Sequence, residues 1–155
     1  MGKFTAAVED HLVLEARVRL PPGDERMLAS LGRPVPRPVS IRLLIDTGAR
    51  RTTLIPGIVR HLNPRPRGEA RIVTPLASIE ASLHWVCLEF PGTRLPAFPE
   101  LLVARLPMPH RLAQFHGLLG RDLLRQFASF EYEGQRGCYT LRDSSGLFGW
   151  LRRLL

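Results

Sequence analysis

Proline and glycine interrupt this chain so often that few stretches are long enough for more than a strand or a short helix. The chain has 155 residues, of which 14 are proline and 13 are glycine. Many of them gather in clusters, at Pro21-Pro22-Gly23, 34–38, 64–68, Pro91-Gly92 and 107–109. Proline removes a backbone donor and glycine weakens both helices and strands, so each cluster tends to end an element. This spacing predicts a mainly β fold.

Most segments between the clusters have the side-chain pattern of a strand. The predicted strands are residues 13–20, 39–45, 70–74, 79–90, 98–106, 130–132 and 138–141. The segment 39–45 alternates at first and then becomes fully apolar, as a strand that enters the core would. We expect 70–74 and 79–90 to be the arms of a long hairpin. The last two strands should form a closing hairpin around Gly134 and Gly137.

Two stretches have the pattern of a short helix instead. After Gly120, three apolar residues recur at helical spacing with arginines between them, which predicts one short helix. These residues are Leu123, Leu124 and Phe127. A helical insertion is also expected over residues 24–32, between the first two strands, with Asp24 as its N-cap and Gly32 at its end.

Residues 144–155 are interpreted as an amphipathic tail behind a single domain that spans residues 1–143. The apolar residues of this tail share one helical face, with Arg152 and Arg153 beside them. They are Leu147, Trp150, Leu151, Leu154 and Leu155. We expect a C-terminal helix that docks on its own domain or on a partner subunit, and favour this over an anchor at a membrane surface.

Charge and cysteine content argue against several classes of function. The formal net charge is +8, but the arginines are scattered and are not interleaved with aromatic residues. We interpret them as solvated faces and expect no nucleic-acid partner. No stretch approaches the ~20 apolar residues of a transmembrane helix and no signal-peptide pattern is present, so no membrane partner is expected. Cys87 and Cys138 lack metal or redox spacing, which favours a cytoplasmic protein with reduced thiols.

An acidic residue, Asp46, comes directly after a buried apolar strand. The segment 43–49 is Leu-Leu-Ile-Asp-Thr-Gly-Ala. Burial makes an ionised carboxylate costly, so this residue must be neutralised, hydrogen-bonded or functional. The plain alternative is a turn in which the Asp46 side chain caps the next backbone amides. Taken alone, Asp46, Thr47 and Gly48 favour that turn over catalysis.

A second segment, about seventy residues later, favours catalysis. Residues 117–124 are Gly-Leu-Leu-Gly-Arg-Asp-Leu-Leu. Together the two segments resemble the retropepsin family of aspartic peptidases, in which apolar-apolar-Asp-Thr/Ser-Gly-Ala precedes an apolar-apolar-Gly-Arg segment that opens a short helix. The resemblance covers residues 14–141. It implies a retropepsin-like acid-protease β-barrel.

Aspartic peptidase chemistry needs two carboxylates that face one water. No other aspartate of this chain lies in an Asp-Thr/Ser-Gly setting. The second carboxylate should therefore be Asp46 of a symmetry mate, in a homodimer whose site exists only at the two-fold axis.

The resemblance also implies roles for individual residues. Thr47 should bond across the axis, and Gly48 and Ala49 should carry backbone groups that meet the substrate. Leu118 should line the first specificity pockets. The hairpin over 70–82 is the candidate flap that closes over the peptide. Its tip is placed at 74–78, which includes Thr74 and Pro75, and Pro75 departs from the glycine-rich tips of the retroviral members.

The charges beside the motif are exchanged relative to the retroviral members. Those members tend to have an acid two residues after the Ala of Asp-Thr-Gly-Ala, where the arginine of the Gly-Arg segment can reach it. This chain has Arg50 and Arg51 in that region and Asp122 after Arg121. We expect Asp122 to accept a hydrogen bond from the side chain of Arg51 or Arg50.

These patterns predict an aspartic endopeptidase that acts on peptide or protein substrates. Five histidines show no pairing that suggests a metal site, and no cofactor is expected. The alternative is a non-proteolytic dimeric module that keeps the same cleft for peptide binding or scaffolding. A third possibility, a basic β-domain that docks on nucleic acid, would require arginines gathered on one face.

Overall fold

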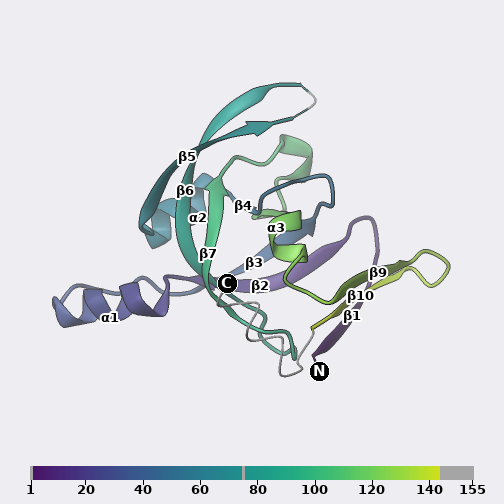
Figure 1. Cartoon of the computed structure of the whole chain (residues 1–155), viewed down its shortest axis with the longest axis horizontal. Helices are drawn as coiled ribbons and strands as arrows, with labels where there is room; N and C mark the ends of the chain where they lie inside the picture. Colours follow the sequence, from purple (N-terminus) through teal and green to yellow (C-terminus); the bar gives the residue numbers. More distant parts are fainter. Residues whose placement is uncertain (1, 75, 144–155) are drawn as a thin grey trace.

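A computed structural model describes residues 2–74 and 76–143 and has a mainly β architecture (Figure 1). The strands are β1 (Lys3–Ala7), β2 (Val13–Arg19), β3 (Val39–Ile45), β4 (Thr53–Leu54), β5 (Pro66–Val73), β6 (Ser78–Glu89), β7 (Phe98–Arg105), β8 (Gly117–Leu119), β9 (Ser129–Glu133) and β10 (Cys138–Arg142). The helices are α1 (Pro22–Ser30), α2 (Pro56–Leu62), the 3-10 turn η1 (His110–Leu112) and α3 (Arg121–Leu124). The expected mainly β fold with a short helix after Gly120 is confirmed.

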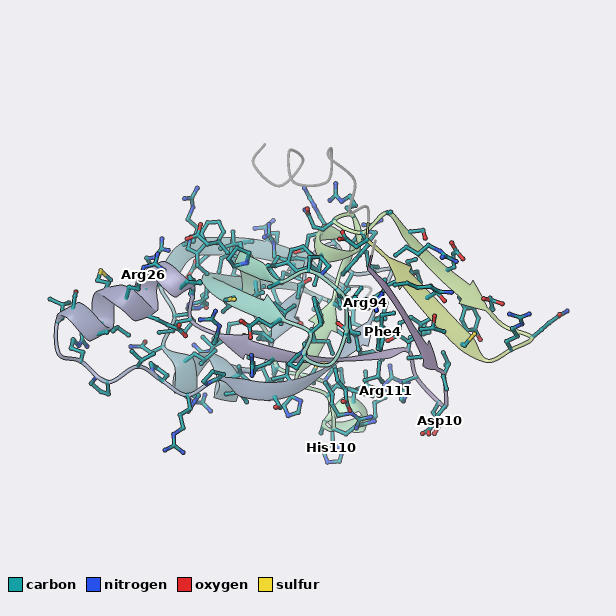
Figure 2. The ribbon with its side chains drawn as sticks, turned by 90° about the horizontal axis from the view of Figure 1, so that it is seen from below. Phe4, Asp10, Arg26, Arg94, His110 and Arg111 are labelled. Atoms are coloured by element: carbon teal, nitrogen blue, oxygen red, sulfur yellow. The ribbon has the colours of Figure 1, made fainter. Side chains whose placement is uncertain are left out.

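The strands form two sheets. The larger sheet has the order β4-β7-β6-β2-β3-β8, and β5 pairs with β6 beside this path. The smaller sheet has the order β1-β10-β9. β3 pairs with β8 in parallel, as β4 does with β7, whereas the pairs that β2 makes with β3 and β6 are antiparallel. α1 and the smaller sheet lie at opposite ends of the molecule in both views (Figure 1, Figure 2).

The two end strands of the larger sheet, β4 and β8, lie against each other. The backbone N–H of Ile55 donates to the carbonyl of His116 at 2.9 Å. A Cβ added at Gly117 would lie 1.9 Å from the carbonyl oxygen of Thr53. In the described residues the larger sheet thus curves until its two end strands meet, although β4 and β8 are not paired as neighbouring strands. This curvature places β8 beside the chain that follows β3.

Alternation along β2 and β3 builds the core, as their sequence patterns predict. Leu14, Ala16 and Val18 of β2 are buried, and so are Ile41, Leu43 and Ile45 of β3. The polar residues between them are exposed. One face of this pair is therefore apolar and packed, which fixes the register because a slip by one residue would expose the whole apolar set.

Tyr139 connects the smaller sheet to the larger one. Its side chain is fully buried in β10, and its hydroxyl donates a hydrogen bond to the carbonyl of Val13 in β2. The rings of Phe4 and Phe130 pack beside it, with centroids at 6.2 and 5.9 Å. Burial raises the pKa of the Tyr139 hydroxyl, because the phenolate would lose its hydration. The neutral, hydrogen-bonded phenol is the form that fits this site.

The insertion after β2 is a helix, but it begins earlier than expected. Pro21 occupies the N-cap position and Pro22 the first turn, and Asp24 makes no cap hydrogen bond. Proline suits the first turn of a helix because its fixed φ matches the helix and the N–H that it lacks would have no partner there anyway. The predicted end is correct, since Gly32 follows the helix with φ +65°. The proposal that Asp24 caps the helix was wrong.

Five short elements of the described structure are not among those expected from the sequence. They are β1, β4, α2, η1 and β8. Among the described residues, no helix combines the length and apolar character needed to cross a bilayer. Residues 144–155, for which a C-terminal helix is expected, lie outside the part of the chain that the structure describes, as does Pro75.

Replacing Tyr139 by Phe should lower the free energy of unfolding by about 1–3 kcal/mol, because the carbonyl of Val13 loses its buried donor. Urea unfolding would measure the change. Tyr132→Phe is the matched control, since Tyr132 lies in the same small sheet but is 57% exposed. Its effect should stay within about 0.5 kcal/mol. Equal effects of the two substitutions would contradict a bracing role for the Tyr139 hydroxyl.

Candidate active site

Asp46 lies where β3 leaves the sheet, between the end of β8 and the start of β2. The Asp46 N–H donates to the carbonyl of Leu119 at 3.0 Å, and the Ile45 N–H donates to the carbonyl of Leu12 at 2.8 Å. In the parallel register of β3 and β8, Leu44 is opposite Leu118 and Ile45 is opposite Leu119. The two sequence segments that suggested a peptidase are therefore side by side.

The Asp46 carboxylate has one oxygen engaged by its own loop. Oδ1 accepts hydrogen bonds from the N–H groups of Gly48 at 2.8 Å and Ala49 at 3.2 Å. This is the turn-capping arrangement that the sequence left open as the plain alternative. Oδ2 accepts no hydrogen bond from the described residues. The side chain is half-buried, so its orientation is fixed while one oxygen can still accept or share a proton.

Gly48 permits this geometry by its lack of a side chain. A Cβ at this position would lie 3.1 Å from Asp46 Oδ1, closer than most Cβ contacts. Thr47 and Gly48 are both exposed in the single chain. Both backbone groups of Ala49 make hydrogen bonds. Its N–H donates to the Asp46 carboxylate and its carbonyl accepts the Arg121 N–H at 2.9 Å. Its backbone is thus committed to holding the loop.

Leu118 and Leu44 form an apolar pair near the ends of β8 and β3. They are neighbours in the β3–β8 register and both side chains are half-buried. The Leu118 N–H donates to the hydroxyl of Thr53 at 3.0 Å. Neighbouring residues of paired strands project to the same face, so the two leucines make a continuous apolar surface.

Asp122 ties α3 to the loop after Asp46, but through Thr52. The Thr52 N–H lies 2.9 and 3.0 Å from the two Asp122 oxygens, and the Thr52 hydroxyl donates to Oδ1 at 2.7 Å. The same hydroxyl accepts the Gly120 N–H at 3.1 Å. Thr52 is only 1% exposed. The backbone N–H and the side-chain hydroxyl of this buried threonine therefore both have partners.

The expected pairing of Asp122 with an arginine side chain is wrong. Arg50 enters this region through its backbone, since its carbonyl accepts the Asp122 N–H at 3.2 Å. The described structure has no ion pair between Asp122 and Arg50 or Arg51. The N–H and hydroxyl of Thr52 already donate hydrogen bonds to the carboxylate. An arginine would first have to order a long, flexible side chain to reach it, which costs conformational entropy.

Thr52 and Thr53 were missed by the sequence-based reasoning. Both are buried and both donate or accept across to the 117–122 segment. The only signal was their position, as polar residues between the arginine pair and the apolar segment 54–55. Such threonines usually belong to exposed turns, so the pattern by itself does not reveal the brace.

The expected hairpin is present as β5 and β6, with a first arm that begins at Pro66 rather than at residue 70. It reaches out from the sheet as a curved arm (Figure 1). Half-buried Thr74 holds its tip, because the Thr74 N–H and hydroxyl donate to the Ala77 carbonyl at 2.8 and 3.0 Å. Three apolar side chains near the tip are exposed. They are Val73 at 76%, Leu76 at 97% and Ile79 at 40%.

Metal-ligand clusters, thiols and clefts are other features on which a protein site can be built. In the part of the chain that is described, no group of three His, Cys, Asp or Glu side chains could hold a metal ion. Cys87 and Cys138 are free thiols. A cleft of about 520 Å³ lies between β1, β2 and the 91–93 turn, and Asp46 does not line it.

Removing the Asp122 carboxylate should weaken the loop that carries Asp46. Asp122→Ala leaves the buried Thr52 N–H and hydroxyl without their acceptor, so we expect a loss of about 1–3 kcal/mol in the free energy of unfolding. Chemical denaturation would measure it. Asp10→Ala is the control, since Asp10 is exposed and should change stability by less than about 0.5 kcal/mol. A similar small effect at both positions would rule out the brace.

Comparison with known proteins supports the fold. No protein-family model and no curated protein sequence matches this chain. The solved structure of a retropepsin-like aspartic protease from Rickettsia conorii matches with a TM-score of 0.59 over 90% of this chain and 89% of that chain, at 16% identity. EIAV protease complexed with the inhibitor HBY-793 matches with a TM-score of 0.48 over 76% of this chain and 88% of that one, at 20% identity. The chain has a retropepsin-like fold.

Proposed function

We propose that this protein is an aspartic endopeptidase whose active form is a homodimer. The observation that carries the proposal is the placement of Asp46, which ends a buried strand on a retropepsin-like fold with one carboxylate oxygen oriented by Gly48 and Ala49. The Rickettsia conorii neighbour is described as an aspartic protease. The substrate would be an extended segment of a peptide or protein.

The reaction requires a second carboxylate from a second copy of the chain. One Asp46 takes a proton from the shared water as the water oxygen attacks the peptide carbonyl. The other, protonated Asp46 donates a hydrogen bond to the carbonyl oxygen and polarises it. The proton gained in the first step then passes to the leaving nitrogen as the carbon–nitrogen bond breaks. Since Thr47 and Gly48 are exposed in the single chain, they are free to face a partner across the two-fold axis.

The remaining residues would bind and enclose the substrate. Leu118, together with Leu44, offers an apolar surface for a side chain next to the cleaved bond. Ala49 would act mainly by holding the loop, because its backbone groups are already bonded. The flap would close through its tip, where Thr74 orders the turn and Pro75 follows. Exposed apolar residues near that tip would lose their contact with water when the flap covers a peptide.

A non-proteolytic peptide-binding dimer is the alternative. One observation favours it, since the two hydrogen bonds to Asp46 Oδ1 give the carboxylate a structural use that needs no catalysis. The open second oxygen favours the enzyme, because a turn cap needs only one. Cleavage measurements separate the two functions.

The first expected outcome concerns assembly. If Asp46 must meet its symmetry mate, the protein should form dimers that dissociate on dilution. Light scattering or sedimentation across a concentration series would show this. A protein that stays monomeric at high concentration cannot carry out the mechanism.

The second expected outcome concerns cleavage. Asp46→Asn should keep the fold, because the amide oxygen can still accept the Gly48 and Ala49 hydrogen bonds. It should lose activity by roughly 10²- to 10⁴-fold, because the amide cannot take up the proton of the water. Mass spectrometry of a peptide library incubated with each form would read the new termini. Activity should fall both where the two carboxylates are protonated and where both are ionised.

Glu15→Gln is a suitable control for this experiment, since it removes one carboxylate from an exposed position on β2, away from the flap, and should leave cleavage unchanged. Cleavage that is equal in wild type and Asp46→Asn would indicate a contaminating protease. Absence of cleavage by a wild-type dimer at every pH would favour the binding module.

A further inference from the structure

α1 projects from one end of the molecule with apolar residues exposed. The helix extends away from the sheets, and its far end turns back toward β3 (Figure 1). None of its residues is buried. Met27 is 53% exposed and Leu31, directly after the helix, is 64% exposed. They are four residues apart and so share one face. Val35, in the returning segment, is 38% exposed.

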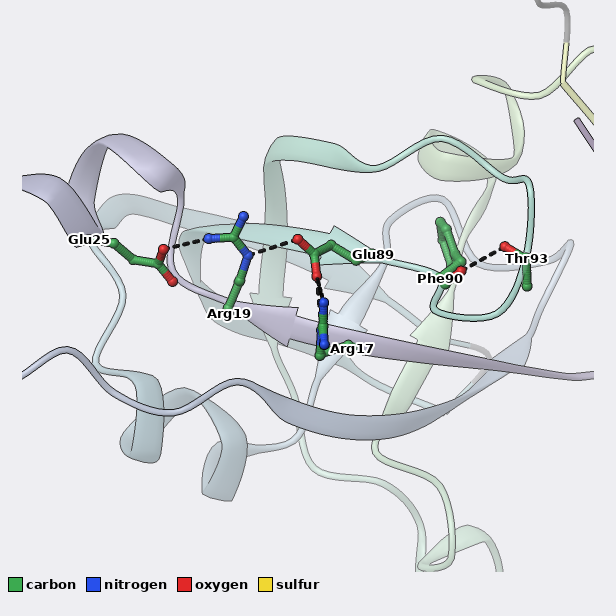
Figure 3. A network of polar contacts seen from close by, with 6 residues as sticks. All are labelled: Arg17, Arg19, Glu25, Glu89, Phe90 and Thr93. Carbon is green, nitrogen blue, oxygen red and sulfur yellow. Dashed lines mark hydrogen bonds and ion pairs between the residues drawn. The ribbon is translucent and has the colours of Figure 1, made fainter.

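Ion pairs hold the base of α1 and engage its acidic side chains. Glu25 pairs with Arg19, Arg19 donates to Glu89 at 2.9 Å, and Arg17 pairs with Glu89 at 2.7 Å (Figure 3). Burial by itself would raise the pKa of Glu89, but the hydrogen bonds from Arg17 and Arg19 outweigh it and hold the pKa below its ordinary value. The helix is thereby fixed to β2 and β6.

A second ion pair anchors the same turn of α1. Asp24 lies 3.3 Å from Arg65, in the segment that leads into β5. With Asp24 and Glu25 both engaged, the projecting end keeps only positive charge. Arg26 and Arg33 are exposed and make no ion pair with the described residues. Arg26 is visible on the outer side of the helix (Figure 2).

We propose that this end of α1 docks on an anionic lipid surface. The docking end consists of Arg26, Met27, Leu31, Arg33 and Val35. Its apolar side chains would enter the boundary between headgroups and acyl chains, while the arginines remain at the anionic headgroups. The formal net charge of +8 adds a longer-range attraction to the same surface.

The arrangement fits a lipid surface better than the groove of a partner protein. A helix that binds in a protein groove presents apolar anchors over two or more turns, at i, i+4 and i+7. α1 presents only Met27 and Leu31 before Gly32 ends the helix. Shallow insertion into a bilayer requires fewer apolar residues, provided that cations lie beside them. The projecting position of α1 (Figure 1) also lets this end reach an extended surface.

The test is co-sedimentation of the full chain with phosphatidylcholine vesicles, with and without phosphatidylglycerol. We expect binding only to the anionic vesicles, and weaker binding at high salt. The double substitution Met27→Ser with Leu31→Ser should lower the partition coefficient about tenfold. Arg33→Gln should lower it about fivefold. None of these side chains is buried, so melting curves should remain unchanged.

Two matched controls make the result specific to α1. Tyr132→Ser removes another large exposed side chain, and Arg105→Gln removes another exposed arginine without an ion pair in the described structure. Both should bind anionic vesicles nearly as well as wild type. The proposal is overturned if the α1 substitutions and the controls have equal effects, because binding would then follow net charge alone. It is also overturned if the protein does not bind anionic vesicles, and binding of an acidic amphipathic peptide would then favour a protein partner.

Discussion

The hydrogen bonds between Asp122 and Thr52 are the constraint on which the candidate site depends. They connect the first turn of α3 to the loop that follows Asp46 in the chain. Without them, that loop would be held mainly by backbone bonds to Ala49 and Arg50. Because Thr52 is buried, breaking the connection would leave polar groups without water or a protein partner. The position of the Asp46 carboxylate is thus tied to a residue far away in sequence.

Close backbone packing is the second condition for this arrangement. A Cβ at Gly120 would lie 2.5 Å from the carbonyl carbon of Arg51, and one at Gly117 would lie 1.9 Å from the Thr53 oxygen. Any side chain at either position would push β8 away from the loop. The glycines of the second sequence segment therefore serve packing, and the apolar pair of Leu44 and Leu118 follows from the register that this packing permits.

Charge is distributed differently from what the scattered arginines suggested. Some arginines are bound in the network that fixes α1 to β2 and β6. Others, such as Arg26 and Arg33, remain unpaired in the described structure at the projecting end of the same helix. A sequence scan for basic blocks cannot separate these two groups, because pairing depends on strands and helices that are distant in the chain.

The sequence by itself determined the mainly β class, the strands around the core and the β5–β6 hairpin. These features follow from local periodicity and from proline and glycine, which act within a few residues. Only the tertiary structure decided that Asp122 binds Thr52, that Asp24 is no cap, and that β4 closes against β8. Each of these depends on which polar groups lose water and meet across the fold, and a contact between residues seventy positions apart has no local signature.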